Sequence, residues 1–177
     1  MELIQLNDEL LRQIDTEWRR EIELYEADVF PNYYRMVLDW ARKFVAGQAD
    51  QGNFAYVLTK EASDKSRTVL AILDIMHVSP RSNAPWIKLL KVYLRPSLDA
   101  ALEPPPETLE EVAAFAILKT VALATTNNHS ADLVKVASNG QMDRKFFLEF
   151  SKNKDLANHF AVSVRGGWLE IAGRDSP

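Results

Sequence analysis

TVLAILDIMHV, residues 68–78, is the stretch that decides the fold, and WIKLLKVYL, residues 86–94, follows it. The first is a nearly continuous apolar run, which is typical of a central strand covered on both faces. FAYVLT, residues 54–59, precedes it across the polar connection KEASDKSR. Together they predict three consecutive antiparallel strands in the middle of the chain.

Helical patterns precede these strands. Residues 8–27 carry apolar side chains at spacings of three and four, and a second such pattern runs from Tyr34 to Val45 and stops at Gly47. Amphipathic helices of this kind usually bury their apolar stripe. We expect both to cover a sheet.

The rest of the chain alternates between the hydrophobic period of a helix and that of a strand. The predicted elements are a largely apolar helix over 108–126, a strand over 133–137, a short helix over 142–152, and a hairpin over 160–172 that turns at Arg165-Gly166-Gly167. The whole pattern predicts an α+β fold: a mixed, mainly antiparallel central sheet flanked by helices. We expect one domain over residues 1–177, with its N-terminal helical part at about 8–47 and the sheet and core helices at about 54–172.

Composition narrows the classes of partner. The chain has 177 residues, a formal net charge of −4 and no basic run, so we expect no nucleic-acid partner. Polar residues interrupt every apolar stretch before the roughly 18 residues that a membrane helix needs, and the N-terminus has no basic signal region. The absence of cysteine excludes disulfides and thiolate metal sites and fits a cytoplasmic location.

The order of these elements resembles the GNAT superfamily of acyl-CoA-dependent N-acetyltransferases. VLAILDIMHV and LLKVYLRP carry the resemblance for the two central strands, and LVKVASNGQMDRKFFLEF carries it for the fifth strand and the next helix. The resemblance extends over about residues 30–172 and rests on the hydrophobic pattern and on the order of the predicted helices and strands. Leu94-Arg95-Pro96 is similar to the family's strand-ending motif of a hydrophobic residue, any residue and proline. The resemblance implies a GNAT-like fold, acetyl-CoA as donor and an amine as acceptor.

The family's phosphate-binding loop is not matched. In the family an Arg/Gln-x-x-Gly-x-Gly/Ala loop follows the proline, and its backbone amides hold the pyrophosphate of coenzyme A together with the next helix's N-terminus. With Pro96 set on the family proline, Asp99 stands where Arg or Gln is expected. Leu102 and Pro104 stand in the glycine positions.

Two further positions depart from the family. Thr108 and Glu111 fit a capping box, whose side chains would satisfy the helix donors that phosphate otherwise uses. The family's general acid is often a tyrosine seven or eight residues past an asparagine that Asn139 matches. Phe146 and Phe147 occupy those positions, and we expect both to pack the helix onto the sheet.

Two ionisable residues of the central strand are candidate catalytic bases. Asp74 interrupts AILDIMH, and a buried carboxylate needs a partner, a polar cleft or a proton. It is either a base in a cleft or a residue paired with Lys88 or Lys91 on the neighbouring strand. His77 is the second candidate, on the opposite face because it lies three residues on, and is otherwise a loop-edge histidine. Three scattered histidines predict no metal site.

The resemblance also implies where acetyl-CoA would bind. Its pantetheine arm would form strand-like hydrogen bonds with the backbone of the third predicted strand, at Lys91, Val92, Tyr93, Leu94 and Arg95. Three acidic residues at the start of the next helix, Glu107, Glu110 and Glu111, would repel an incoming phosphate. The charges of Lys91 and Arg95, which lie before the loop, would compensate in part for that repulsion.

Two functions stay open. The first is a divergent N-acetyltransferase that uses acetyl-CoA, a small-molecule or peptide amine as acceptor, and Asp74 or His77 as base. The second is a GNAT-like domain without cofactor that holds a protein partner, through the cleft or through aromatic residues of the N-terminal helices (Trp18, Tyr25, Tyr33, Trp40). The final hairpin, as an antiparallel edge, also allows a homodimer.

Overall fold

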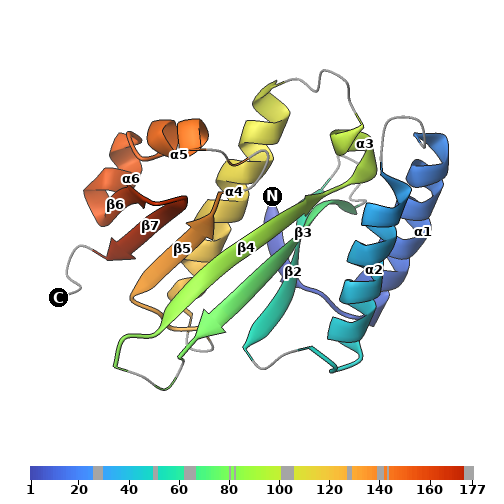
Figure 1. The fold of residues 1–177 in the computed structure, drawn as a ribbon, viewed down its shortest axis with the longest axis horizontal. Coiled ribbons are helices and arrows are strands. Elements are labelled where there is room, and N and C mark those ends of the chain that lie inside the picture. The colour runs from blue at the N-terminus through green and yellow to red at the C-terminus, as the bar shows by residue number, and fades with distance from the viewer. Residues whose placement is uncertain are drawn as a thin grey trace.

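One seven-stranded sheet organises the chain, in the strand order β1-β2-β3-β4-β5-β7-β6 (Figure 1). The computed structural model describes residues 1–25, 30–49, 52–61, 67–79, 81, 83–100, 106–126, 129–138, 142 and 144–173, without the side chains of 106–108. The strands are β1 (Glu2–Gln5), β2 (Asn53–Glu61), β3 (Arg67–Val78), β4 (Trp86–Leu94), β5 (Leu133–Ala137), β6 (Phe160–Arg165) and β7 (Trp168–Gly173). The helices are α1 (Asp8–Leu24), α2 (Pro31–Val45), α3 (Pro96–Asp99), α4 (Pro106–Ala124), α5 (Arg144–Phe150) and α6 (Lys154–His159).

Neighbouring strands pair antiparallel at every step except one. β4 and β5 run parallel, and α3 and α4 lie between them in the chain. The prediction of an α+β fold with a mixed, mainly antiparallel sheet flanked by helices is therefore confirmed. The order of elements that resembles the GNAT fold is confirmed as well.

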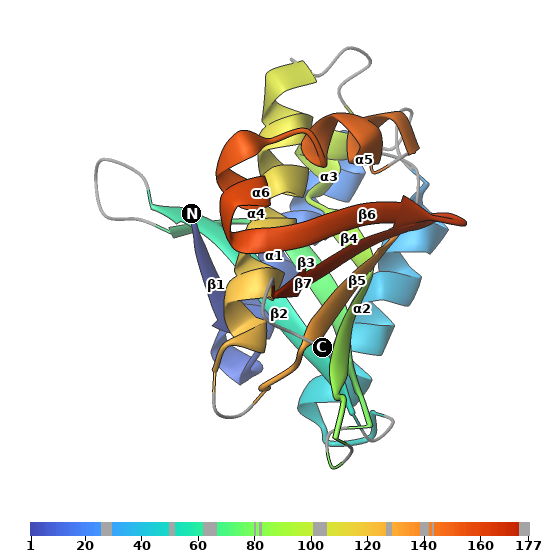
Figure 2. The ribbon, with the colours of Figure 1, turned by 90° about the vertical axis from the view of Figure 1, so that its left-hand side faces the viewer.

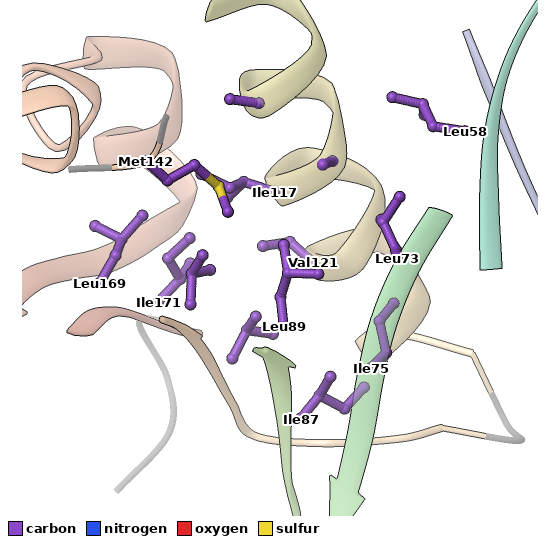
Figure 3. Packing of buried hydrophobic residues seen from close by; sticks show 14 of the residues in the cluster. Leu58, Leu73, Ile75, Ile87, Leu89, Ile117, Val121, Met142, Leu169 and Ile171 are labelled. Atoms are coloured by element: carbon purple, nitrogen blue, oxygen red, sulfur yellow. The ribbon is translucent and has the colours of Figure 1, made fainter. Parts of the chain in front are cut away.

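Helices cover the two faces of the sheet unequally. α4 packs on one face, which we call the α4 face, and α1 and α2 pack on the other, which we call the α1–α2 face (Figures 1 and 2). The core under α4 contains buried side chains from β2, β3, β4, β5 and β7, among them Leu73, Ile87 and Leu169 (Figure 3). The core under α1 and α2 takes side chains from β2, β3 and β4 but none from β5, β6 or β7. Among the described residues, no helix therefore covers the α1–α2 face of β5 and β7.

The final hairpin turns as the sequence predicts. Gly166 has φ 59° and Gly167 has φ 109°, both in the left-handed region that favours glycine. β7 lies between β5 and β6, so β6 forms the edge of the sheet.

Three local features differ from the sequence prediction. β1 is a short strand that pairs with β2 at the other edge, over a stretch too short to show an alternation. α6 is an additional helix, and the Asn153 side chain caps it by accepting hydrogen bonds from the amides of Asp155 and Leu156. α4 begins at Pro106, so Thr108 lies inside its first turn and the predicted capping box is wrong.

Candidate functional site

β4 and β5 separate halfway along β4. The two strands pair only over residues 86–89 of β4 and 133–136 of β5, and β4 continues on that side to Leu94 without a strand partner among the described residues (Figure 1). A β-bulge lies at the point of separation, because Ile75 pairs with Leu89 while Asp74 pairs with Lys91, which makes Leu90 the extra residue. The residues proposed to hold pantetheine, 91–95, therefore follow the bulge on the diverging half of β4.

The backbone of this segment presents only some of its donors to the opening. The Arg95 amide donates to the Leu70 carbonyl at 2.9 Å, so it points toward β3. Successive amides of a strand point to alternate edges, so Lys91 and Tyr93 also face β3. The amides and carbonyls of Val92 and Leu94 face the side from which β5 has departed. The geometry narrows the five predicted backbone contacts to these two residues.

The turn after Pro96 is a short helix whose amides are already occupied. Leu98 and Asp99 donate to the Arg95 carbonyl, and Ala100 donates to the Pro96 carbonyl. The Ser97 amide donates to the Glu21 carboxylate at 3.1 Å. The amides of Asp99 and Ala100 begin the segment that holds phosphate in the family, and those of Ser97 and Leu98 directly precede it. Here α3 and a carboxylate from α1 use them, and the predicted loop positions Leu102 and Pro104 lie outside the described residues.

Arg95 is held by the same carboxylate. Its Nε lies 2.6 Å from Glu21 Oε1, and its guanidinium also pairs with Glu21 and lies 3.5 Å from Glu17. The side chains of Arg95 and Glu21 are 18% and 14% exposed, so this pair is largely shielded from water. Arg95 therefore offers little free charge to an incoming phosphate.

Asp74 lies on the α1–α2 face of β3, opposite Lys91 and beside the point where β4 and β5 separate. Its Oδ1 is buried and has no hydrogen-bond partner within the described part of the chain. Burial raises the pKa of Asp74 above 3.8, and the positive charge of Lys91 lowers it in part. A half-buried carboxylate with an unused oxygen and a raised pKa is suited to take a proton.

A group of aromatic side chains, Tyr93 among them, lies on the same face of the sheet as this carboxylate. Tyr93 contacts Tyr33 and Trp40 of α2, with ring centroids 6.1 and 5.6 Å apart. Burial, the Asp74 charge and Tyr33 raise the pKa of Tyr93 to about 12. Tyr33 is 42% exposed, so the aromatic group reaches the surface. The sequence alone indicated Tyr33 and Trp40 only as aromatic residues of a helix. The packing of α2 against β4 places both beside Tyr93.

A buried tyrosine of α2, Tyr34, links this helix to the turn after β4. The Tyr34 hydroxyl donates to Asp99 Oδ2 at 2.7 Å. Burial and this hydrogen bond raise the pKa of Tyr34. Asp99, which stands where the family has Arg or Gln, therefore serves as a structural acceptor for α2.

His77 lies on the α4 face, opposite to Asp74 as predicted, near the start of β4. It is 8% exposed, and its Nε2 has no hydrogen-bond partner within the described residues. His129, from the segment after α4, lies 5.9 Å away between ring centroids and shares a 2.8 Å hydrogen bond with the Tyr56 hydroxyl. Burial, followed by the neighbouring His77, lowers the pKa of His129. The structure thus brings together two histidines that are far apart in the sequence, but His77 and Asp74 lie on opposite faces of the sheet.

Phe146 and Phe147 differ in environment. Phe147 is fully buried in the core under α4, whereas Phe146 is half-buried and contacts Phe150 with ring centroids 5.8 Å apart. Both side chains therefore pack against this core, Phe147 completely and Phe146 in part, as the sequence predicts. Asn139, the residue matched to the family asparagine, lies outside the described residues.

We expect Phe147→Tyr to lower the free energy of unfolding by about 1–3 kcal/mol, because the new hydroxyl would be buried among apolar side chains. Phe146→Tyr is the matched control and should change it by no more than about 0.5 kcal/mol, since that ring reaches solvent. Urea denaturation of both variants measures the difference. Equal effects would contradict the assignment of Phe147 to the core.

The uncovered half of the α1–α2 face carries charged and aromatic side chains, and we call it the open sheet face. Its residues are Trp86 and Lys88 of β4, Lys135 of β5, Trp168 and Glu170 of β7, and Arg165 of β6. Lys135 pairs with Glu170 at 2.8 Å, and Arg165 lies 3.8 Å from the same carboxylate. The Lys88 ammonium lies 4.4 Å from the Trp86 ring centroid and 5.8 Å from that of Trp168.

Comparison with solved structures finds proteins of similar architecture. A putative acetyltransferase of the GNAT family from Desulfovibrio desulfuricans matches 97% of this chain and 96% of its own, with 12% identity and a TM-score of 0.45. The KacTA–DNA complex matches 76% and 79%, with 13% identity and a TM-score of 0.38. AtaT complexed with acetyl-methionyl-tRNAfMet matches 78% and 82%, with 16% identity and a TM-score of 0.38. No family model and no curated protein matches the chain.

These similarities concern the fold alone, and the GNAT-like assignment rests on the strand order and the β4–β5 separation. The comparison does not test the expectation that nucleic acid is not a partner. That expectation stays a prediction from charge. None of the helices in the described residues is long and apolar enough to cross a membrane.

Proposed function

We propose that the chain is a divergent acyl-CoA-dependent N-acyltransferase that moves an acetyl group from acetyl-CoA to an amine. One observation carries the proposal: β4 separates from β5 directly beside Asp74, and Val92 and Leu94 direct their backbone toward the opening. Strand-like hydrogen bonds to a pantetheine amide need only such backbone groups, whatever the side chains are.

The residues support a simple transfer reaction. The acceptor amine attacks the thioester carbonyl carbon, and a C–N bond forms as the C–S bond breaks. Asp74 takes the proton that the amine nitrogen loses, and its raised pKa makes it a stronger base than an exposed aspartate. Coenzyme A leaves as a thiolate and takes a proton from water. The rings of Tyr33, Trp40 and Tyr93 would hold the acceptor as it arrives in its ammonium form, because aromatic faces attract ammonium groups. The ammonium loses one proton to water before the neutral amine attacks.

Asp74 is preferred to His77 as the base. His77 lies on the α4 face, near the end of β4 that pairs with β5, and only 8% of it is exposed. An acceptor at the β4–β5 opening on the α1–α2 face would not reach it.

The occupied amides after Pro96 favour a second candidate, a module without cofactor that binds a protein partner. Three large apolar side chains near the junction of α1 and α2 would supply its surface: Leu24, Phe30 and Met36 are 71%, 81% and 71% exposed. Such side chains are typical of interaction surfaces when they lie together.

Titration calorimetry with four ligands tests the proposal. We expect acetyl-CoA, desulfo-CoA and S-acetylpantetheine to bind, and ADP to give no measurable heat. Acetyl-CoA should bind less than about tenfold more tightly than S-acetylpantetheine, a difference of about 1.4 kcal/mol, because Glu21 already occupies Arg95 and the Ser97 amide.

Two outcomes would count against this view. No heat and no thermal shift at millimolar acetyl-CoA would exclude the transferase and favour the protein-binding module. Tight binding of ADP would mean that a phosphate site exists despite the occupied amides, and the donor would then be held by its nucleotide end.

A further inference from the structure

We propose that the acyl acceptor carries an anionic group, a carboxylate or a phosphate-type group, which Lys88 binds on the open sheet face. The inference rests on the proposed function for its second anchor, because Asp74 is taken to receive the amine. The acceptor class is then an amine that bears an acidic group on the same small molecule.

Lys88 and Asp74 project from the same face of the sheet. Met76 pairs with Lys88 and Asp74 pairs with Lys91, so Lys88 is the diagonal neighbour of Asp74 across one step of β3. Diagonal neighbours lie roughly 7–8 Å apart on a sheet. The Lys88 ammonium lies beside Trp86 and Trp168, on the side of β4 away from β3, so the acceptor must bridge from Asp74 across β4 to that ammonium.

Lys135 and Lys91, the two lysines next to Lys88, each lie close to a carboxylate, whereas in the described part of the chain Lys88 does not. Lys135 pairs with Glu170 at 2.8 Å, and Lys91 lies opposite Asp74 and acts on its pKa. Within the described residues Lys88 forms no ion pair with a carboxylate, although it is half-buried. Its ammonium is held by two indole rings instead, at 4.4 Å from Trp86 and 5.8 Å from Trp168.

This setting strengthens an attraction to anions. The indole rings restrict the position of the ammonium and reduce its contact with water, and a charge in a less polar environment attracts an opposite charge more strongly. Lys135 adds a second ammonium 4.8 Å from the Trp86 centroid. Within the described part of the chain no helix covers this half of the face, which leaves it open to a ligand (Figure 1).

The test uses three small amines of similar length, added to the full chain without acyl donor. β-Alanine carries a carboxylate, 2-aminoethylphosphonate carries a phosphonate, and propylamine carries neither. Dissociation constants come from saturation-transfer NMR. We expect at least one of the two anionic amines to bind at least about tenfold more tightly than propylamine. The difference between those two tells which acidic group the site prefers.

Variants assign the effect to Lys88. Lys88→Met keeps the length and packing of the side chain. It should lower the affinity of the protein for the two anionic amines to its affinity for propylamine. Lys88→Arg should restore the preference, and Lys152→Met, at an exposed lysine after α5, should leave it unchanged. Equal binding of all three amines by the unmodified protein would overturn the proposal, as would an equal loss for all three in Lys88→Met.

The outcome is separable from that of the proposed function. Failure of acetyl-CoA to bind would remove the transferase reaction and leave the anion preference measurable in the same NMR titration. Transfer to propylamine as fast as to β-alanine would keep the transferase and refute the role of Lys88.

Discussion

Asp74→Asn should abolish acetyl transfer and, at the same time, stabilise the fold at neutral pH. Loss of a general base typically costs about 10²–10⁴-fold in rate. The stability gain arises because the Asp74 carboxylate is half-buried with an unused oxygen, so ionisation opposes folding. Since the carboxylate is only partly shielded from water and Lys91 offsets part of the penalty, we expect a gain of no more than about 1 kcal/mol.

The same variant should change how stability depends on pH. Because the folded-state pKa of Asp74 is raised, the folded protein binds this proton more tightly than the unfolded chain does. The wild-type protein therefore loses this contribution as pH rises from 3.8 through the raised folded pKa. Asp74→Asn should remove that part of the curve, which urea denaturation at several pH values measures.

Asp132→Asn provides a matched control, because Asp132 is an exposed aspartate in the loop before β5. It should change neither turnover nor stability by a measurable amount. If Asp74→Asn keeps full turnover, Asp74 has no place in the reaction. If it destabilises the protein, its carboxylate has a partner that the present geometry does not reveal.

Glu21→Gln should give a large loss of stability. One carboxylate accepts hydrogen bonds from the Arg95 guanidinium and from the Ser97 amide, and both side chains of the ion pair are less than a fifth exposed. Removing one partner of a shielded pair leaves the other charge poorly solvated. We expect a loss of about 2 kcal/mol, or roughly 4–8 °C in melting temperature for a chain of this size.

Glu23→Gln is the control, since Glu23 is exposed on the same helix. A double-mutant cycle with Arg95→Gln isolates the pair itself. The double variant should be less destabilised than the sum of the two single variants. Additive losses would show that the contact contributes little, and the argument that Arg95 is unavailable to phosphate would fail with it.

Most of the sheet could be predicted because its strands are long and apolar. The bounds of β4 and β5 agree with the sequence prediction, and β3 and the hairpin differ from it by about one residue. β1 was missed because four residues are too few to define a strand period, and α6 was missed because its six residues make less than two helical turns. The start of α4 was misplaced because Pro106, a common first residue of helices, competes with Thr108 as the signal.

The site was less predictable, because it depends on contacts between distant segments. Asp74 could be selected from the sequence as a charge in an apolar run. The role of Glu21 could not, since nothing in the pattern of α1 shows that a carboxylate 76 residues away accepts from the Ser97 amide. Lys88 and Lys135 form no basic run, and only the register of β4 and β5 places them side by side.

The short β1 strand has a consequence for handling the protein. It occupies the outer edge of β2 from Tyr56 to Thr59, a segment of high strand propensity. Without it, that edge would offer unpaired backbone groups to other copies of the chain, which is a recognised route to aggregation. Truncation of the first six residues would thus threaten solubility even though it touches neither Asp74 nor the open sheet face.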